Sequence, residues 1–388
     1  MVRGGRAARN RAAPAGVLVR PPRARGQPHE AAPSVSIPIR NVYYLLCYAW
    51  DHVREGETVD VGSEEFSEMA DLFAKVLNEG VSRLISRGLD RDYLAVSEDI
   101  RGLKGKLDLA TTVKRNLLLT GKTHCSFDEL SYDVPQNQIL KATLRQLGMV
   151  TRLDPEQRRR AGRLYRKLDA VSDVPLRPRL FRTVRIHRNN QFYSFLLHLC
   201  RIIYDNLLVN QEAGTAEFYD FREDEQKMGL LFEQFVRRFC ERETNYTVDA
   251  PKIDWFRAEG IETDLRHLPR MQTDIVLRSP ERTIIVDTKF YKNPLDRRYD
   301  GERVHAGNLY QIFAYAMNWA EGASQSGEPE PEGWLLYAAV DGEFDYRFEV
   351  MGRMIRVCSV DLGKEWKAIE KRLKEMVLRT QQVVATST

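Results

Sequence analysis

Residues Met271–Tyr291, MQTDIVLRSPERTIIVDTKFY, hold two apolar runs on either side of a turn-rich RSPER segment. This pattern predicts a β-hairpin with a loop of four or five residues. With the loop centred on Pro280 and Glu281, Asp274 is expected directly opposite Asp287. Opposed side chains on one face of a hairpin lie about 4.5–5.5 Å apart at Cβ, so the two carboxylates should be close neighbours.

Lys289 is expected beside Asp287, because residues two apart on a strand share a face. The second strand is apolar on both faces, as a central strand should be. Like charges at the end of such a strand repel, and a divalent cation would offset the repulsion; oxygen ligands favour Mg²⁺, with Mn²⁺ able to substitute. Lys289 could then assist an attacking water or stabilise charge on a phosphate. The alternative is an exposed ion pair worth ~0–1 kcal/mol.

Three further polar residues fit the same chemistry. Glu233 stands in an apolar helical stretch just upstream of the strands, and a buried Glu is rare unless it is paired or bound to metal. Its alternative is an i,i+4 salt bridge to Arg237. Gln311 and Tyr315 lie four apart and share a helix face, where they could position DNA backbone or a metal-bound water. Their alternative is ordinary helix packing with a polar tip.

The chain divides by composition into three parts. Residues 1–34 form an Arg/Ala/Pro-rich segment that is expected to be a disordered tail, since residues 1–30 carry seven Arg and one acid. Residues 35–220 read as an α+β and helical region. Two short strands are expected within 93–113 around a Gly102–Gly105 turn, another over 124–132, and a helix from Pro135 to Leu147.

Residues 221–388 read as an α/β domain with a central mixed sheet. Helices are expected over 228–243 and about 303–320. Further strands are expected over 334–340, 345–350 and 354–360, followed by a C-terminal helix.

Bulk composition excludes some classes of protein and leaves others open. The 388 residues have a formal charge of +4, which permits nucleic acid as a partner without arguing for it. No run approaches the length of a transmembrane helix, so no membrane association is expected. The five cysteines are far apart and form no C-x-x-C pair, which predicts packing roles in a reducing cytoplasm.

Taken together, the acids, the lysine and the Gln311/Tyr315 pair resemble, in their order along the chain, the RecB-like branch of the PD-(D/E)xK nucleases. The N-terminal part is similar to the McrC family. The segments that carry this second resemblance are Ile37–Leu46, Arg101–Asp108, Phe127–Leu130 and the Pro135-x-Asn137-x-Ile139-Leu140 pattern. Together the two resemblances cover roughly residues 37–378.

The resemblance implies a partner-binding α+β N-terminal domain followed by an α/β PD-(D/E)xK endonuclease domain. It further implies the endonuclease subunit of a 5-methylcytosine restriction system, hydrolysing DNA with Mg²⁺ in complex with an McrB-like AAA+ GTPase ring. No G-x-x-x-x-G-K-[ST] loop occurs in the sequence, so a nucleotide-driven motor would be another chain. The site implied on these grounds has Glu233, Asp274, Asp287 and the Thr288 carbonyl as metal ligands, with Lys289, Gln311 and Tyr315 as further catalytic residues.

Two alternatives remain open. One is a stand-alone RecB-like DNA repair nuclease. Many of these nucleases hold an iron–sulfur cluster with four cysteines. Only Cys240 and Cys358 lie in the nuclease half, which disfavours a repair nuclease with such a cluster. The other is a non-catalytic activator of an AAA+ partner.

Overall fold

The computed structural model describes residues 37–59, 61, 66–184, 190–210, 215–256, 261–292, 294–298, 301–340 and 342–378. The predicted disordered tail, residues 1–34, lies outside the described residues. Within the described ranges, no helix is both long and apolar enough to cross a membrane.

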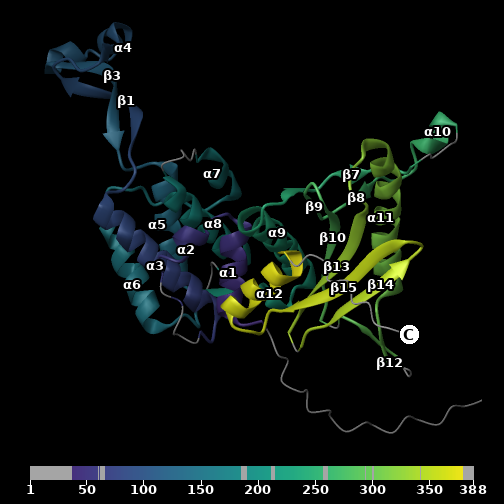
Figure 1. Ribbon diagram of the computed structural model, residues 1–388. Helices are drawn as coiled ribbons and strands as arrows, with labels where there is room; N and C mark the ends of the chain where they lie inside the picture. Colours follow the sequence, from purple (N-terminus) through teal and green to yellow (C-terminus); the bar gives the residue numbers. More distant parts are fainter. Residues whose placement is uncertain are drawn as a thin grey trace, which may run out of the picture. The chain divides into compact units, whose positions relative to one another are not determined.

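A six-stranded mixed sheet forms the C-terminal part of the chain (Figure 1). Its order is β14 (Asp345–Val350), β15 (Arg353–Asp361), β13 (Pro331–Ala339), β10 (Thr283–Phe290), β9 (Ile275–Arg278) and β6 (Thr247–Asp249). The three neighbouring strands β15, β13 and β10 run parallel, and the remaining pairs are antiparallel. The expected central mixed sheet and the three expected later strands are thereby confirmed.

Helices cover both faces of this sheet. On one face, alternate strand residues such as Ile284 and Val286 belong to a core shared with α9 (Glu225–Glu243) and α12 (Trp366–Leu378). On the other face, Val276 and Ile285 pack with residues of α11 (Ala306–Ser326). A strand segment buried on both faces favours apolar residues at successive positions, which explains the continuous Ile284–Val286 run of β10.

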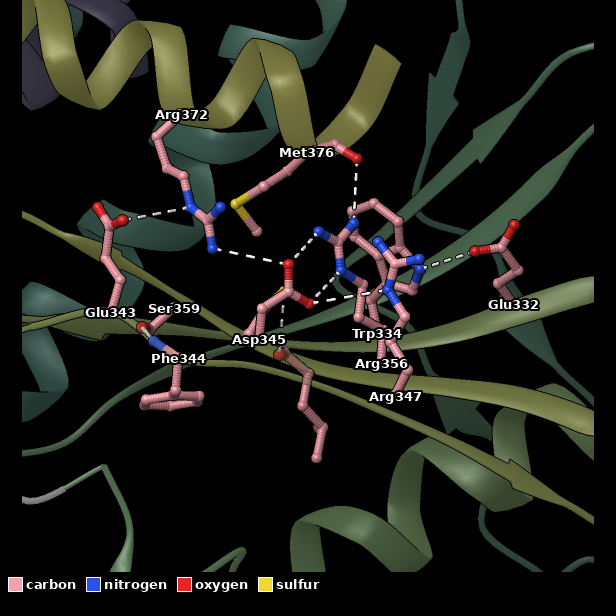
Figure 2. A network of polar contacts seen from close by, with 12 residues as sticks. Glu332, Trp334, Glu343, Phe344, Asp345, Arg347, Arg356, Ser359, Arg372 and Met376 are labelled. Carbon is pink, nitrogen blue, oxygen red and sulfur yellow. Dashed lines mark hydrogen bonds and ion pairs between the residues drawn. The ribbon is translucent and has the colours of Figure 1, made fainter. Parts of the chain in front are cut away.

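Buried Arg356 and half-buried Arg282 hold helix α12 on the sheet, and Figure 2 shows the contacts of Arg356. Arg356 donates to both carboxylate oxygens of Asp345, at 2.8 and 2.6 Å, and to the Met376 carbonyl at 3.1 Å. Its guanidinium lies 4.4 Å from the centroid of the Trp334 ring. Arg282 reaches the next carbonyl, that of Val377, at 3.2 Å. Cations thus satisfy carbonyls of the last turn of α12, where the helix dipole favours them.

Long helices dominate the region before residue 221. They are α1 (Ile39–Ala49), α3 (Met69–Arg87), α5 (Pro135–Gly148), α6 (Pro155–Lys167) and α8 (Gln191–Asn206). A separate sheet has the order β1-β3-β2, with β1 (Asp92–Arg101), β2 (Lys106–Leu107) and β3 (Lys122–Ser131). The helix that Pro135 opens is confirmed, and so is the strand over 124–132.

The expectation for residues 93–113 is partly wrong. The two strands there do not pair with each other around the Gly102–Gly105 turn; both pair with β3. The second strand is only two residues long, and helix α4 (Leu109–Lys114) follows it, capped by the Asp108 carboxylate. The ten-residue β3 offers a long antiparallel partner for β1, and this outweighs a short local hairpin.

The remaining elements are short. They are α2 (Val53–Gly56), α7 (Pro178–Thr183), α10 (Glu262–Leu265), β4 (Leu207–Asn210), β5 (Thr215–Phe218), β7 (Lys252–Ile253), β8 (Met271–Gln272), β11 (Asp296–Arg298), β12 (Gly301–Arg303) and the 3₁₀ turns Leu117–Thr120 and Phe221–Glu223.

Aromatic packing joins α1 to the C-terminal part of the chain. Phe235 of α9 is fully buried, and its ring lies 5.6 Å from Tyr48 of α1 and 5.6 Å from Trp366 of α12. Trp366 also stacks on Tyr44, with ring centroids 4.9 Å apart. One core cluster therefore runs from Ile37 to Val377. The division at residue 220, drawn from composition, stays a prediction.

Asn41 provides a polar clamp at the same joint. The side chain is fully buried, and its Nδ2 donates to the carbonyls of Leu362, at 2.7 Å, and Lys364, at 2.8 Å. Asn41→Ala should lower the free energy of unfolding by about 2 kcal/mol, because two carbonyls lose their donor in a dry setting. Urea unfolding measures the change. Ser86→Ala, which removes only an exposed bond to the Ser82 carbonyl, should change it by less than about 0.5 kcal/mol. Equal effects of the two variants would contradict the clamp.

Candidate active site

The hairpin forms in the predicted register. Thr283 pairs with Arg278, and Val286 pairs with Ile275, so the loop centres where the turn residues indicated. The ladder stops there, one pair short of Asp274 and Asp287.

Thr288 explains why the ladder stops. Its backbone N–H donates to Asp274 Oδ2 at 2.8 Å, and its hydroxyl donates to the same oxygen at 3.0 Å. The Asp274 side chain therefore takes the place of a strand partner beyond Ile275. Strand β10 continues to Phe290 with Asp274 fixed beside it.

Asp287 is the most deeply buried acid of the group. It is 1% exposed, and neither carboxylate oxygen accepts a hydrogen bond of normal geometry from the described residues. Oδ2 forms an ion pair with Lys289. Burial raises the pKa of Asp287 to about 6; Lys289 opposes this shift, and the negative charges of Asp274 and Glu233 add to it. An anion at this position is therefore undercompensated by the protein alone.

Lys289 is linked to α11 by a chain of hydrogen bonds. Its Nζ donates to Gln311 Oε1 at 3.3 Å, and Gln311 Nε2 donates to the Tyr315 hydroxyl at 2.8 Å. Tyr315 in turn donates to the Gln272 carbonyl at 2.9 Å. Although burial opposes it, the Asp287 carboxylate keeps the pKa of Lys289 above its ordinary value. The ammonium is thus charged. The hydrogen bonds from Lys289 to Gln311 and from Gln311 to Tyr315 hold it in place.

Glu233 reaches the site from α9. Burial raises its pKa, and the nearby Asp274 carboxylate raises it further, against the influence of Arg237. Arg237 Nη2 donates to Glu233 Oε1 at 3.1 Å. The i,i+4 salt bridge between Glu233 and Arg237 is thereby confirmed. The role of Glu233 as a metal ligand stays a prediction, which its electrostatic coupling to Asp274 supports. Arg237 also donates a 2.5 Å hydrogen bond to the Asp274 carbonyl. This contact has no signature in the sequence, because only tertiary structure brings the two residues together.

The carboxylate oxygens of Glu233, Asp274 and Asp287 are of the kind that bind a divalent ion, although these side chains are not already arranged around one. Across the described residues, no group of three or more His, Cys, Asp or Glu side chains is already arranged to hold a metal. Asp287 nonetheless keeps a buried carboxylate next to two other acids, and among the described residues its ion-pair partner is Lys289. Such an undercompensated group of anions fits a hard cation. The ligand set of Glu233, Asp274, Asp287 and the Thr288 carbonyl stays a prediction.

The burial of Asp287 has a measurable consequence for stability. Because the folded pKa is raised from 3.8 to about 6, folding is disfavoured once the carboxyl ionises, by up to about 3 kcal/mol. This penalty is absent below pH 3.8, grows between pH 3.8 and 6, and is complete above that. Metal-free Asp287→Asn should therefore gain stability over the wild type as pH rises from about 4.5 to 8.

Chemical denaturation in EDTA at several pH values tests this expectation. Asp254→Asn, at a side chain 71% exposed, is the control and should differ from the wild type by less than about 0.5 kcal/mol throughout. A pH-independent difference for Asp287→Asn would contradict the raised pKa.

Comparison with known proteins shows the family to which this chain belongs. The chain belongs to the family described as McrBC 5-methylcytosine restriction system component, whose family model matches residues 26–338. It is 36% identical over 341 residues to the "Type IV methyl-directed restriction enzyme EcoKMcrBC" of Escherichia coli (strain K12). That match covers 88% of this chain and 97% of the relative.

Solved structures show the shared fold. One is described as a "Refined half-complex from tetradecameric assembly of Thermococcus gammatolerans McrB AAA+ hexamers with bound McrC". A chain of it superposes with a TM-score of 0.56 at 17% identity, covering 89% of this chain and 78% of that chain. The resemblance to the McrC family is thereby confirmed. The five cysteines are all buried and free, as expected of packing residues.

Proposed function

We propose that this chain is the endonuclease subunit of a 5-methylcytosine-dependent restriction system, hydrolysing DNA phosphodiesters with Mg²⁺ in the cytoplasm. Its partner would be an McrB-like AAA+ GTPase ring, bound through residues 35–220. The observation that carries the proposal is the undercompensated Asp287 carboxylate beside Lys289, Asp274 and Glu233. Membership of the McrBC family supports the biological setting.

The residues have separable roles in this proposal. Glu233, Asp274 and Asp287, with the Thr288 carbonyl, would hold the ion, for which Mn²⁺ could substitute. When bound, the ion supplies Lewis-acid activation of a phosphodiester and of water. Lys289 holds a proton at Nζ close to the scissile group, oriented by Gln311 and, through it, Tyr315. Thr288 fixes the Asp274 carboxylate at Oδ2, which would leave Oδ1 as the oxygen available to the ion.

A reconstituted cleavage assay tests the function. The chain is combined with the AAA+ GTPase of the same organism, GTP, Mg²⁺ and plasmid that carries 5-methylcytosine. Cutting is expected only when all four are present, and EDTA or unmethylated plasmid should abolish it. Cutting without the GTPase would favour a stand-alone repair nuclease. GTPase stimulation without any cutting, in Mg²⁺ or Mn²⁺, would favour a non-catalytic activator.

A further inference from the structure

Arg237 connects two of the acids through one guanidinium. Its Nη2 donates to Glu233 Oε1 at 3.1 Å and to the backbone carbonyl of Asp274 at 2.5 Å. Glu233 belongs to α9, whereas Asp274 precedes β9. The arginine is 30% exposed, so water screens these contacts only in part. A single side chain therefore ties the helix to the point where the hairpin ladder ends.

The Asp274 carbonyl needs such a donor. Asp274 lies outside the β9–β10 ladder, which ends at Ile275, so no pairing with β10 satisfies its carbonyl. Thr288 holds the carboxylate from the β10 side, and Arg237 holds the carbonyl from the α9 side. Asp274 is thus fixed at both its main chain and its side chain, by two different elements.

This arrangement leaves one carboxylate oxygen of Asp274 and one of Glu233 without a hydrogen-bond donor among the described residues. Thr288 occupies Asp274 Oδ2, and Arg237 occupies Glu233 Oε1. Within the described part of the chain, Asp274 Oδ1 and Glu233 Oε2 accept no hydrogen bond from another residue, and they remain available to a ligand. Burial and then the Asp274 carboxylate raise the pKa of Glu233, and the Arg237 charge opposes both.

We propose that Arg237 is a positioning residue that sets the spacing between Glu233 and Asp274 for binding of a divalent ion. The inference rests on the proposed function, because it concerns the same ion. A planar guanidinium can bridge two acceptors in fixed directions, whereas a lysine ammonium is a point charge on a flexible stem. The fixed directions of the two N–H bonds on Nη2, and not charge alone, are the feature that Arg237 contributes.

The test measures metal binding directly. Mn²⁺ is titrated by calorimetry into the metal-free full-length wild type, Arg237→Lys and Arg237→Gln. The matched control is Arg238, the next residue on α9, which pairs with Glu241 at 2.7 Å and is 48% exposed. Both Arg237 variants should raise the Mn²⁺ Kd at least about 10-fold, as loss of an outer-shell partner does. Arg238→Lys and Arg238→Gln should stay within about twofold of the wild type.

Cleavage with the GTPase partner supplies the second readout. In the Arg237 variants, the Mn²⁺ concentration for half-maximal cutting should rise in parallel with the Kd, while the KM for DNA changes by less than about threefold. Thermal unfolding of every variant shows whether the titrations were made on folded protein. Arg237→Lys, which keeps the charge, provides a readable result if Arg237→Gln unfolds.

Several outcomes would overturn the inference. Arg237→Lys binding Mn²⁺ like the wild type would show that charge alone suffices. A raised KM for DNA with unchanged Mn²⁺ affinity would place Arg237 on the DNA instead. A wild type that binds Mn²⁺ as its Arg237 variants do would leave the nuclease proposal standing and remove only this inference. A wild type that binds no Mn²⁺ and cuts nothing would remove both.

Discussion

DNA cleavage by Asp287→Asn in the reconstituted complex is expected to fall at least about 1000-fold, equivalent to about 4 kcal/mol of transition-state stabilisation. The asparagine amide keeps the shape of the side chain and loses the negative charge that attracts the ion. Lys289 also loses its ion-pair partner at Oδ2. Because Asp287 is 1% exposed and interacts with Lys289, Asp274 and Glu233, an acid on the surface is not expected to replace it.

Binding to the GTPase ring and stimulation of GTP hydrolysis should be unchanged in the same variant, since the fold is kept. Cutting of methylated plasmid, resolved on agarose gels over a time course, measures the loss. Asp249→Asn is the matched control. This acid lies on β6 of the same sheet, is 37% exposed and pairs with Arg278. It should retain activity within about twofold. If Asp287→Asn cut as fast as this control, the site would lie elsewhere in the chain.

Phe235→Ala should lower the free energy of unfolding by about 3–5 kcal/mol. The ring is fully buried and contacts aromatic residues of three helices, with centroids 5.6 Å from both Tyr48 and Trp366 and 5.8 Å from Phe239. Truncation to alanine leaves a cavity that these large, rigid rings cannot close.

Urea unfolding followed by tryptophan fluorescence is a sensitive measurement here, since Trp366 borders the cavity. Leu230→Ala, on the same helix at 55% exposure, is the control and should change stability by less than about 0.5 kcal/mol. A loss of under 1 kcal/mol for Phe235→Ala would mean that the α1–α9–α12 joint contributes little.

The hairpin could be predicted from sequence because its information is local. Turn residues fix the loop, and a two-residue period fixes which side chains share a face. The register and the Asp287–Lys289 neighbourhood followed from these rules and are confirmed. The Gln311–Tyr315 hydrogen bond is equally local, since it spans one helical turn.

The remainder depends on contacts between segments far apart in the chain. Neither the capture of the Asp274 carboxylate by Thr288 nor the bond from Arg237 to the Asp274 carbonyl has a sequence signature. Both arise where the ladder ends, and they depend on how the hairpin and α9 lie in the folded chain. For the same reason, local turn signals around Gly102–Gly105 could not reveal that β1 and β2 both pair with β3.

Helix α9 meets two demands at once, because one face packs on Tyr48 of α1 while another presents Glu233. Recombination between distant homologues near residue 220 would set a foreign first helix against Phe235 and Trp366, whose rings pack on Tyr48. In such a chimaera, the aromatic residues of α1, α9 and α12 would no longer fit one another, and α9 is also the helix that carries Glu233. We therefore expect the segments on either side of residue 220 to be inherited together, with divergence concentrated outside this joint.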